Sequence, residues 1–276
     1  MEAAHADDRR RVRRQREGRP LSDRTAGWAL VTGATAGLGA EFARQLARRG
    51  LSVVLVARDR ERLEELAAQL RSAYGVEAEA LPADLADRDQ LAAVERRLAD
   101  PDRPITVLVN NAGYGLREQF EQNPVEAEQA FLDVLVTAPM RLSHAALAAM
   151  LPRRSGTILN IASVAAFTPR GTYGAAKAWV VSFSRWANLT YRSRGVTVTA
   201  VAPGFVRTEF HDRMQVRTSS VPSVLWLRPA PVVAAALRAA DRGRAVAIPS
   251  LRYKALTALA RILPARLAAT GALRAR

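Results

Sequence analysis

Three side chains near the middle of the chain have the types and spacing of an acid–base centre. Tyr173 and Lys177 are four residues apart, which on a helix places both on one face, one turn apart. A nearby ammonium favours the phenolate and lowers the pKa of tyrosine from about 10, so the phenol could exchange a proton closer to neutral pH. Ser163 ends the preceding apolar run and could hold a carbonyl or alcohol oxygen. By itself, the pattern is equally that of an ordinary surface helix.

A glycine-rich turn near the start of the chain could bind a phosphate. It follows an apolar run at 28–31 and leads into an amphipathic helix that reaches about residue 49. Gly33 would permit the tight turn, Gly37 would let the backbone approach a pyrophosphate, and Gly39 would let the helix pack close to the strand. A plain flexible turn is the alternative, but the strand–helix context favours a coenzyme loop.

Two charged residues bear on which coenzyme this loop would serve. Arg58 follows the second apolar run, where an acidic residue would hold the ribose 2′-hydroxyl of NAD and an arginine suits the 2′-phosphate of NADP. Asp59 comes directly after it, so NAD stays possible while NADP is favoured. Asp84 follows the third run and could either reach the adenine amino group or cap a helix.

The order of apolar runs and helical patterns predicts the scaffold for these residues. Strands and helices alternate from 27 to 250, which indicates an α/β fold with a single Rossmann-like, doubly wound parallel sheet and helices on both faces. Ligands bind such sheets at the carboxyl ends of the strands. We expect strands at 28–31, 51–57, 76–81, 105–109, 156–161, 195–201 and 245–248. We expect helices at about 37–49, 60–73, 88–98, 125–150 with a bend near Pro139, 172–192 and 232–240.

Composition narrows the class of protein. The 276-residue chain has no cysteine, which excludes disulfides and thiolate chemistry, and its three scattered histidines lead us to expect no metal site. The net charge of +15 comes almost entirely from arginine, without a nucleic-acid-binding motif, so we expect no nucleic-acid partner. No apolar run is long enough to cross a membrane and no signal peptide is evident, which predicts a cytoplasmic protein.

The sequence also predicts the character of segments outside the sheet. Residues 1–26 read as a disordered basic arm, and 209–230 as a mobile lid over the substrate. The basic amphipathic extension 251–276 could touch an anionic membrane or pack on its own domain. Large apolar residues on the helix of Tyr173, including Trp179 and Trp186, indicate core packing together with a subunit interface in a homodimer or homotetramer.

Four motifs follow one another along the chain: T-G-A-T-A-G-L-G at 32–39, N-N-A-G at 110–113, Ser163 before Y-G-A-A-K at 173–177, and P-G-F-V-R-T at 203–208. With these motifs, residues 27–250 resemble the short-chain dehydrogenase/reductases. The resemblance implies hydride transfer between a nicotinamide coenzyme and a small-molecule carbonyl/alcohol pair. It implies that Tyr173 is the general acid, that Lys177 lowers the pKa of Tyr173 and holds the nicotinamide ribose, and that Ser163 bonds the substrate oxygen.

The expected coenzyme contacts, beyond Tyr173 and Lys177, come from the ends of the predicted strands. They are Gly33, Ala34, Thr35, Gly37, Leu38, Gly39, Arg58, Asp84, Asn111, Ala112, Gly113, Pro203, Gly204, Val206 and Thr208.

Two departures from the family pattern leave a second interpretation open. Leu135 stands where many members carry an asparagine that helps build a water-linked proton path to the lysine. Ser163 and Tyr173 are ten residues apart, a few fewer than is usual in the family, which indicates a more open pocket. The favoured interpretation is an NADP-preferring oxidoreductase acting on a hydrophobic substrate. The alternative is a coenzyme-binding regulatory or scaffold protein with weak or vestigial activity.

Overall fold

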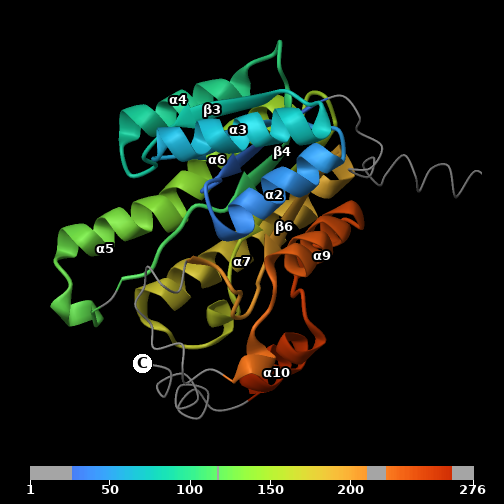
Figure 1. Cartoon of the computed structure of the whole chain (residues 1–276). Coiled ribbons are helices and arrows are strands. Elements are labelled where there is room, and N and C mark those ends of the chain that lie inside the picture. Colours follow the sequence, from blue (N-terminus) through green and yellow to red (C-terminus); the bar gives the residue numbers. More distant parts are fainter. Residues whose placement is uncertain (1–26, 117, 210–221, 263–276) are drawn as a thin grey trace, which may run out of the picture.

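The computed structural model describes residues 27–116, 118–209 and 222–262, and they are organised around a seven-stranded parallel sheet (Figure 1). The predicted basic arm, most of the predicted lid and the end of the C-terminal extension lie outside these residues. The strand order is β3-β2-β1-β4-β5-β6-β7, so the predicted doubly wound sheet is confirmed. The strands are β1 (Trp28–Thr32), β2 (Ser52–Ala57), β3 (Ala78–Pro82), β4 (Ile105–Asn110), β5 (Gly156–Ile161), β6 (Val196–Val201) and β7 (Val246–Ala247).

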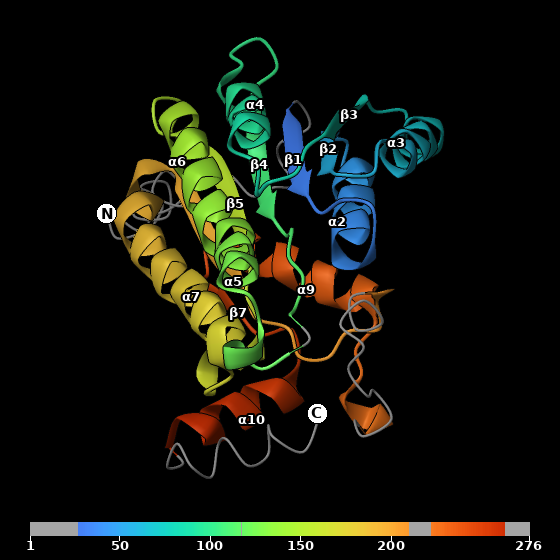
Figure 2. The ribbon, with the colours of Figure 1, turned by 90° about the vertical axis from the view of Figure 1, so that its left-hand side faces the viewer.

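Helices cover both faces of the sheet (Figure 2). One face packs against α2 (Gly37–Arg48), α3 (Arg60–Tyr74) and α9 (Pro229–Asp241), and the other against α4 (Arg88–Ala99), α6 (Ala138–Met150) and α7 (Gly171–Tyr191). The central strands β1, β2 and β4 are almost continuously apolar, as burial on both faces requires, whereas the edge strand β3 is half-buried. A last helix, α10 (Leu251–Ile262), lies apart from both layers, at the bottom of Figure 1.

The predicted long helix at 125–150 is present as one continuous helical run, but its hydrogen-bond pattern changes partway along. α5 (Val125–Leu132) and α6 are joined by a π-helical turn, η3 (Asp133–Thr137), in which the Ala138 N–H donates to the Asp133 carbonyl. The expected bend at Pro139 is therefore a wider turn just before it. Pro139 has no N–H to donate to the Leu135 carbonyl, so regular α-helical bonding cannot run through this point.

A chain of buried amides and hydroxyls ties the helices of one face to the sheet. The Asn110 side chain, at the end of β4, donates to Asn160 Oδ1 on β5 at 2.8 Å and to Ser143 Oγ on α6 at 3.2 Å. Asn160 in turn donates to Ser184 Oγ on α7 at 3.0 Å. Buried polar groups strongly favour the arrangement that pairs them, so this chain fixes α6 and α7 against β4 and β5.

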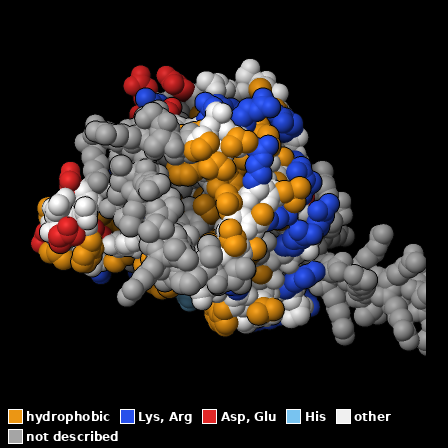
Figure 3. Space-filling view, turned by 90° about the horizontal axis from the view of Figure 1, so that it is seen from below, with side chains coloured by type: hydrophobic (Ala, Val, Ile, Leu, Met, Phe, Trp, Pro, Cys, Tyr) orange, Lys and Arg blue, Asp and Glu red, His pale blue; other side chains and the backbone are white. Residues whose placement is uncertain are grey.

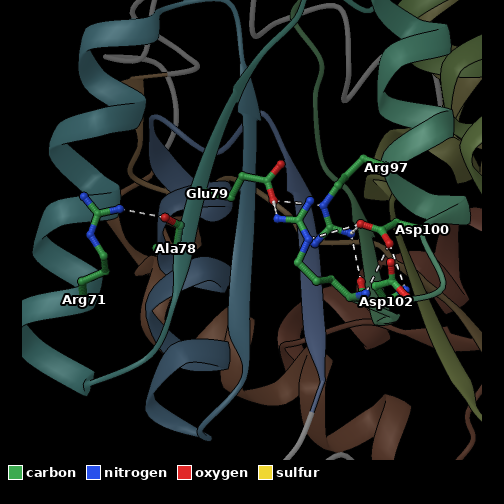
Figure 4. A network of polar contacts seen from close by, with 7 residues as sticks. Arg71, Ala78, Glu79, Arg97, Asp100 and Asp102 are labelled. Carbon is green, nitrogen blue, oxygen red and sulfur yellow. Dashed lines mark hydrogen bonds and ion pairs between the residues drawn. The ribbon is translucent and has the colours of Figure 1, made fainter.

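A cluster of ions lies near the amino ends of the strands (Figure 4). Glu79 on β3 accepts from Arg97 on α4 and from Arg103 before β4, both at 3.0 Å. Both guanidinium groups also lie over the Trp28 ring on β1, 5.0 and 5.7 Å from its centre. Asp100 pairs with both arginines. The cluster therefore joins edge strand β3 to α4 and to the central strands.

Removing the carboxylate at the centre of this cluster should destabilise the fold. Glu79→Gln leaves the buried Arg97 guanidinium with weaker acceptors, and we expect the free energy of unfolding to fall by about 2 kcal/mol in urea denaturation. The matched control is Glu95→Gln, which breaks the more exposed Glu95–Arg141 pair and should cost less than about 1 kcal/mol. Equal losses in the two variants would contradict the role given to Glu79.

Candidate active site

A cavity of about 1260 Å³ opens at the carboxyl ends of the strands. Segments that follow β1 to β6 all contribute to its wall, as expected for a parallel sheet of this order. Most of the predicted site residues meet here: Gly33, Thr35, Gly37, Leu38, Arg58, Asp84, Asn111, Ala112, Gly113, Ser163, Tyr173, Lys177, Pro203, Gly204, Val206 and Thr208.

The glycine-rich turn has the close packing that its sequence predicts. Gly33 and Gly37 both have left-handed φ angles, +64° and +54°, which favour glycine. A Cβ atom at Gly39 would lie 2.1 Å from the Gly33 carbonyl oxygen, so only glycine lets α2 start this close to β1. Ala34 is fully buried and its N–H donates to the Val56 carbonyl. Ala34 and Gly39 therefore support the loop from behind.

The start of α2 differs from those of α3 and α4, the next two helices along the chain. Its N-cap residue is Ala36, whose methyl group cannot accept a hydrogen bond from the first amides of the helix. By contrast, α3 and α4 are capped by the carboxylates of Asp59 and Asp87. An N-terminus without a side-chain cap, facing a cavity, can bind an anion with its backbone N–H groups.

A threonine that sequence reasoning missed joins the loop to the next strand. Thr32, the last residue of β1, accepts from the backbone N–H groups of Asn111 and Ala112, both at 3.0 Å. The Asn111 side chain donates to the carbonyls of Thr32 and Gly33 at 2.9 and 3.1 Å. Asn111 thus ties neighbouring strand ends together and lines the cavity as well. The available signal was a hydroxyl residue at the strand end directly before Gly33.

The serine, tyrosine and lysine come together as their spacing predicts. Tyr173 lies in the first turn of α7, near enough to Ser163 for the serine hydroxyl to influence the pKa of the phenol. Ser163 caps the short 3-10 helix η4 (Val164–Phe167). Lys177 is buried one turn further along, and its Nζ donates to the Ile161 carbonyl at 2.8 Å. That Nζ lies 5.7 Å from the centre of the Tyr173 ring. A proton donor, an oxygen-binding hydroxyl and a cation therefore share one wall of the cavity.

Burial sets the electrostatics of this group. Desolvation raises the pKa of Tyr173, while the Ser163 hydroxyl and the Arg170 charge act in the opposite direction. Desolvation also lowers the pKa of Lys177, from 10.5 to about 8. The pKa of Tyr173 is therefore raised overall in this structure, and the lowering by Lys177 that the family resemblance implies stays a prediction. Loss of water outweighs the nearby charges, and the opposing cation is Arg170.

Leu135 forms an apolar wall behind the tyrosine. It is fully buried in η3 and packs with Phe131 and Ala176. The Phe131 ring lies 6.4 Å from that of Tyr173, and the Leu135 side chain faces Gly113 across the end of β4. Leucine carries no hydrogen-bonding group, so position 135 cannot take part in a proton path here.

Arg58 and Asp59 have separate tasks. Asp59 accepts from the Arg62 N–H at 3.1 Å as the N-cap of α3, and it also pairs with the Arg62 side chain at 3.4 Å. Arg58 is 78% exposed at the cavity, 3.9 Å from Asp84. Asp84 also accepts from the Ala86 N–H at 3.0 Å, while Asp87 caps α4. The competing carboxylate of Asp59 is thus bound to its own helix.

Tyr253 on α10 is a second residue that sequence reasoning missed. Its ring packs directly on Gly204, where a Cβ atom would lie 1.9 Å away. Its hydroxyl accepts from the Phe205 N–H at 3.1 Å and donates to the Leu225 carbonyl at 2.8 Å. α10 therefore closes one side of the cavity, and the described part of the C-terminal extension docks on its own domain. The sequence offered one signal for this contact: Tyr253 and Thr257 are four residues apart among leucines and so lie on one side of the helix.

Neither a metal cluster nor a membrane-spanning helix is present in the part of the chain that the structure describes. There, no group of three or more histidine and carboxylate side chains could hold a metal ion. Within the same residues, every helix is too short or too polar to cross a bilayer.

Comparison with known proteins finds one matching family and several related structures for this chain. The family model for short chain dehydrogenases matches residues 27–218. A short-chain dehydrogenase from Sphingobium yanoikuyae, solved in complex with NADPH, is 40% identical with a TM-score of 0.78, covering 84% of this chain and 93% of that one. A bulky-bulky ketone specific alcohol dehydrogenase from Comamonas testosteroni is 36% identical with a TM-score of 0.74, covering 85% and 92%.

A curated relative is longer than the region it shares with this chain. The very-long-chain 3-oxoacyl-CoA reductase of Anas platyrhynchos is 36% identical over 190 residues, which is 66% of this chain. The chain spans 60% of the length of that relative.

The lowered pKa of Lys177 predicts a pH-dependent stability. Between about pH 8 and 10.5 the unfolded chain holds the Lys177 proton that the folded chain has lost, so stability rises with pH across this window. Relative to Lys177→Met, the wild type should gain up to about 3 kcal/mol of unfolding free energy from pH 8 to 10.5. Urea denaturation along a pH series measures it. Lys254→Met, at an exposed site, controls for loss of a lysine, and a constant difference for Lys177→Met would contradict the assignment.

The Tyr253 hydroxyl should protect the turn at Phe205. In Tyr253→Phe the Phe205 amide loses its acceptor, and we expect its hydrogen exchange to accelerate by about tenfold or more, equivalent to about 1.4 kcal/mol. Exchange detected by NMR or mass spectrometry measures the change. Tyr191→Phe removes a hydroxyl at the far end of α7 and should leave the Phe205 amide unchanged. Unaltered exchange in Tyr253→Phe would show that α10 does not hold this turn.

Proposed function

The chain belongs to the short-chain dehydrogenase/reductase family, and from this premise we propose that it is an NADP-preferring oxidoreductase interconverting a hydrophobic carbonyl compound and its alcohol. One observation carries the proposal. The Tyr173 phenol, close to Ser163 and one turn from the buried Lys177, lines the same cavity as the glycine-rich loop. That loop and the uncapped start of α2 would hold the coenzyme pyrophosphate.

The roles of the three residues follow from their environments. The nicotinamide coenzyme, when bound, supplies or accepts the hydride. In reduction, Ser163 holds the substrate oxygen, and Tyr173 donates its proton to that oxygen as the carbonyl carbon gains the hydride. Burial raises the pKa of Tyr173, so its phenol is protonated at neutral pH. A protonated donor favours the reductive direction. Lys177 keeps a cation beside the phenolate that remains.

The surroundings of Arg58 support NADP as the coenzyme. Asp59 is the N-cap of α3 and is paired with Arg62, so it is poorly placed to accept from a ribose hydroxyl. Arg58 and Arg62 both line the cavity, and their guanidinium groups would suit a 2′-phosphate. The relative from Sphingobium yanoikuyae was solved with NADPH, which agrees with this choice.

The residues that line the cavity support the proposal that the substrate is hydrophobic. Beside Tyr173 its wall includes Tyr114, Val134, Phe205 and Leu256. The relatives include an enzyme described as specific for bulky-bulky ketones and a very-long-chain 3-oxoacyl-CoA reductase. Those substrates belong to those proteins, but both are carbonyl compounds with large apolar parts. A wall of this kind would bind such a substrate by burying its apolar surface.

A second candidate function is a coenzyme-binding regulatory or scaffold protein. The observation that favours it is Leu135, which puts an apolar side chain where a proton path would pass. Coenzyme would then bind to the loop while turnover stays slow. Binding and turnover measured on the same sample separate the two candidates.

Self-association through α7 is part of the proposal. Trp186 and Leu189 are 52% and 82% exposed on its outer side, and Trp179 stacks on Phe183 with 5.0 Å between ring centres. An apolar strip of this kind on a helix is suited to an identical strip on a second copy, as in a homodimer or homotetramer.

Tyr173→Phe is the substitution that tests the function. With a panel of apolar aldehydes and ketones, we expect the wild type to oxidise NADPH faster than NADH. Loss of the phenol should reduce kcat/KM by about 10²- to 10⁴-fold, because a positioned general acid contributes that much. The measurement is coenzyme absorbance during turnover, with coenzyme binding followed by fluorescence.

Tyr191→Phe on the same helix is the control and should keep wild-type turnover. Coenzyme binding without turnover on any carbonyl would support the regulatory candidate. Lack of coenzyme binding would contradict the site as a whole.

A further inference from the structure

The last described helix has its residue types reversed with respect to a solvated surface helix. The side chains of α10 that face the protein, Tyr253 and Thr257, are polar or amphipathic and only 4% and 5% exposed. Leu251, Leu256 and Leu259 are 80%, 46% and 49% exposed. A helix on a water-facing surface normally turns its apolar side inward. We therefore infer that the outward leucines are buried against another apolar surface when the protein functions.

The inward side of α10 is already fully used, so the helix cannot rotate to bury its leucines. Tyr253 is bonded to Phe205 and Leu225 and packs on Gly204. The Thr257 hydroxyl donates to the Tyr253 carbonyl at 2.8 Å. Turning the leucines inward would break these contacts. The exposed apolar side is thus a fixed feature of the described structure.

Positive charge accompanies the exposed leucines. Arg252 and Lys254 are exposed on α10, and Arg252 also donates to the Val224 carbonyl at 2.7 Å. The stretch 242–276 holds eight basic residues and no acidic one. Figure 3 shows this side of the molecule, with hydrophobic side chains across the middle and Lys and Arg along one flank. An apolar side flanked by cations is the pattern of a helix lying in the surface of an anionic membrane.

The position of α10 beside the cavity would link membrane contact to substrate entry. Leu256 and Ala260 line the cavity, while Leu256 is also 46% exposed, so it stands at the rim between cavity and outside. A helix lying in the bilayer surface would place this rim against the lipid. An apolar substrate dissolved in the bilayer could then enter without crossing water. This last step rests on the proposed function, whereas the membrane contact does not.

We propose that the outer side of α10, formed by Leu251, Leu256 and Leu259 with Arg252 and Lys254, binds the surface of an anionic lipid bilayer. The contact combines burial of the leucines among acyl chains with attraction of the cations to lipid headgroups. It is a peripheral contact, because α10 lies flat against its own domain through Tyr253.

Vesicle co-sedimentation of the full chain tests the proposal. The wild type should bind vesicles of phosphatidylcholine and phosphatidylserine, bind phosphatidylcholine alone more weakly, and lose affinity as salt is raised. The double variant Leu251→Ser/Leu259→Ser should lower the partition coefficient by about tenfold or more, since two apolar anchors are lost. Val125→Ser, which removes a similarly exposed apolar side chain at the first residue of α5, is the matched control and should bind as the wild type does.

Charge and apolar burial make separable contributions to this contact. Lys254→Gln should weaken binding only to the anionic vesicles, because it removes a cation and leaves the leucines in place. Circular dichroism and urea denaturation establish that each variant keeps its fold, and the single variant Leu251→Ser, at the first residue of α10, serves if the double variant does not fold. Vesicle binding needs no turnover, so an inactive protein could still pass this test.

Three results would overturn the proposal. The first is a wild type that does not bind anionic vesicles. The second is a double variant that binds them as well as the wild type does, which would place any lipid contact elsewhere in the chain. The third is a concentration-dependent dimer in light scattering that the double variant abolishes while vesicle binding is absent. In that case the cover of α10 is a second copy of the chain.

Discussion

The proposed proton-transfer group depends on a buried ammonium held by one carbonyl oxygen. Lys177 can stay inside the protein only while its Nζ has an acceptor, and the Ile161 carbonyl at the end of β5 provides it at 2.8 Å. This bond fixes the first turns of α7 relative to the sheet. Tyr173, one turn earlier on α7, is held against Ser163, which lies just beyond the end of β5. Further along, Ser184 and Asn160 repeat the attachment.

The two ends of the sheet divide the work between stability and chemistry. At the amino ends, Glu79 and the arginines around Trp28 hold the edge strand to its neighbours and leave little freedom. At the carboxyl ends, the loops are tied by hydrogen bonds between uncharged groups, such as that between Thr32 and Asn111, 79 residues apart in the chain. Disruption of the first cluster should therefore act on the whole fold, whereas changes at the second edge act mainly on what binds there.

Much of the site could be predicted because it depends on short-range pattern and on topology. A strand, a glycine-rich turn and a helix define the coenzyme loop locally, and a parallel sheet brings all carboxyl ends to one edge. Other features depend on contacts between distant segments. The π-helical turn before Pro139 is one such feature. The hydrogen bonds of Tyr253 with Leu225 and Phe205, which precede it by 28 and 48 positions, are another. The raised pKa of Tyr173 could not be predicted, because it depends on how deeply the phenol is buried, and the spacing of residues in the sequence does not show this.

Because α10 supplies the last wall of the cavity, the order of synthesis has a consequence for the newly made chain. Tyr253 follows Gly33 by 220 residues. At about 5 to 20 residues per second, the ribosome makes the coenzyme loop roughly 10 to 40 seconds before the helix that closes the cavity. Gly204 is made 49 residues before Tyr253, so its turn lacks the covering ring for roughly 2 to 10 seconds. The cavity lacks its last wall throughout the longer interval. A nascent chain is therefore most accessible to proteases and chaperones at the place where the finished protein is proposed to hold its substrate.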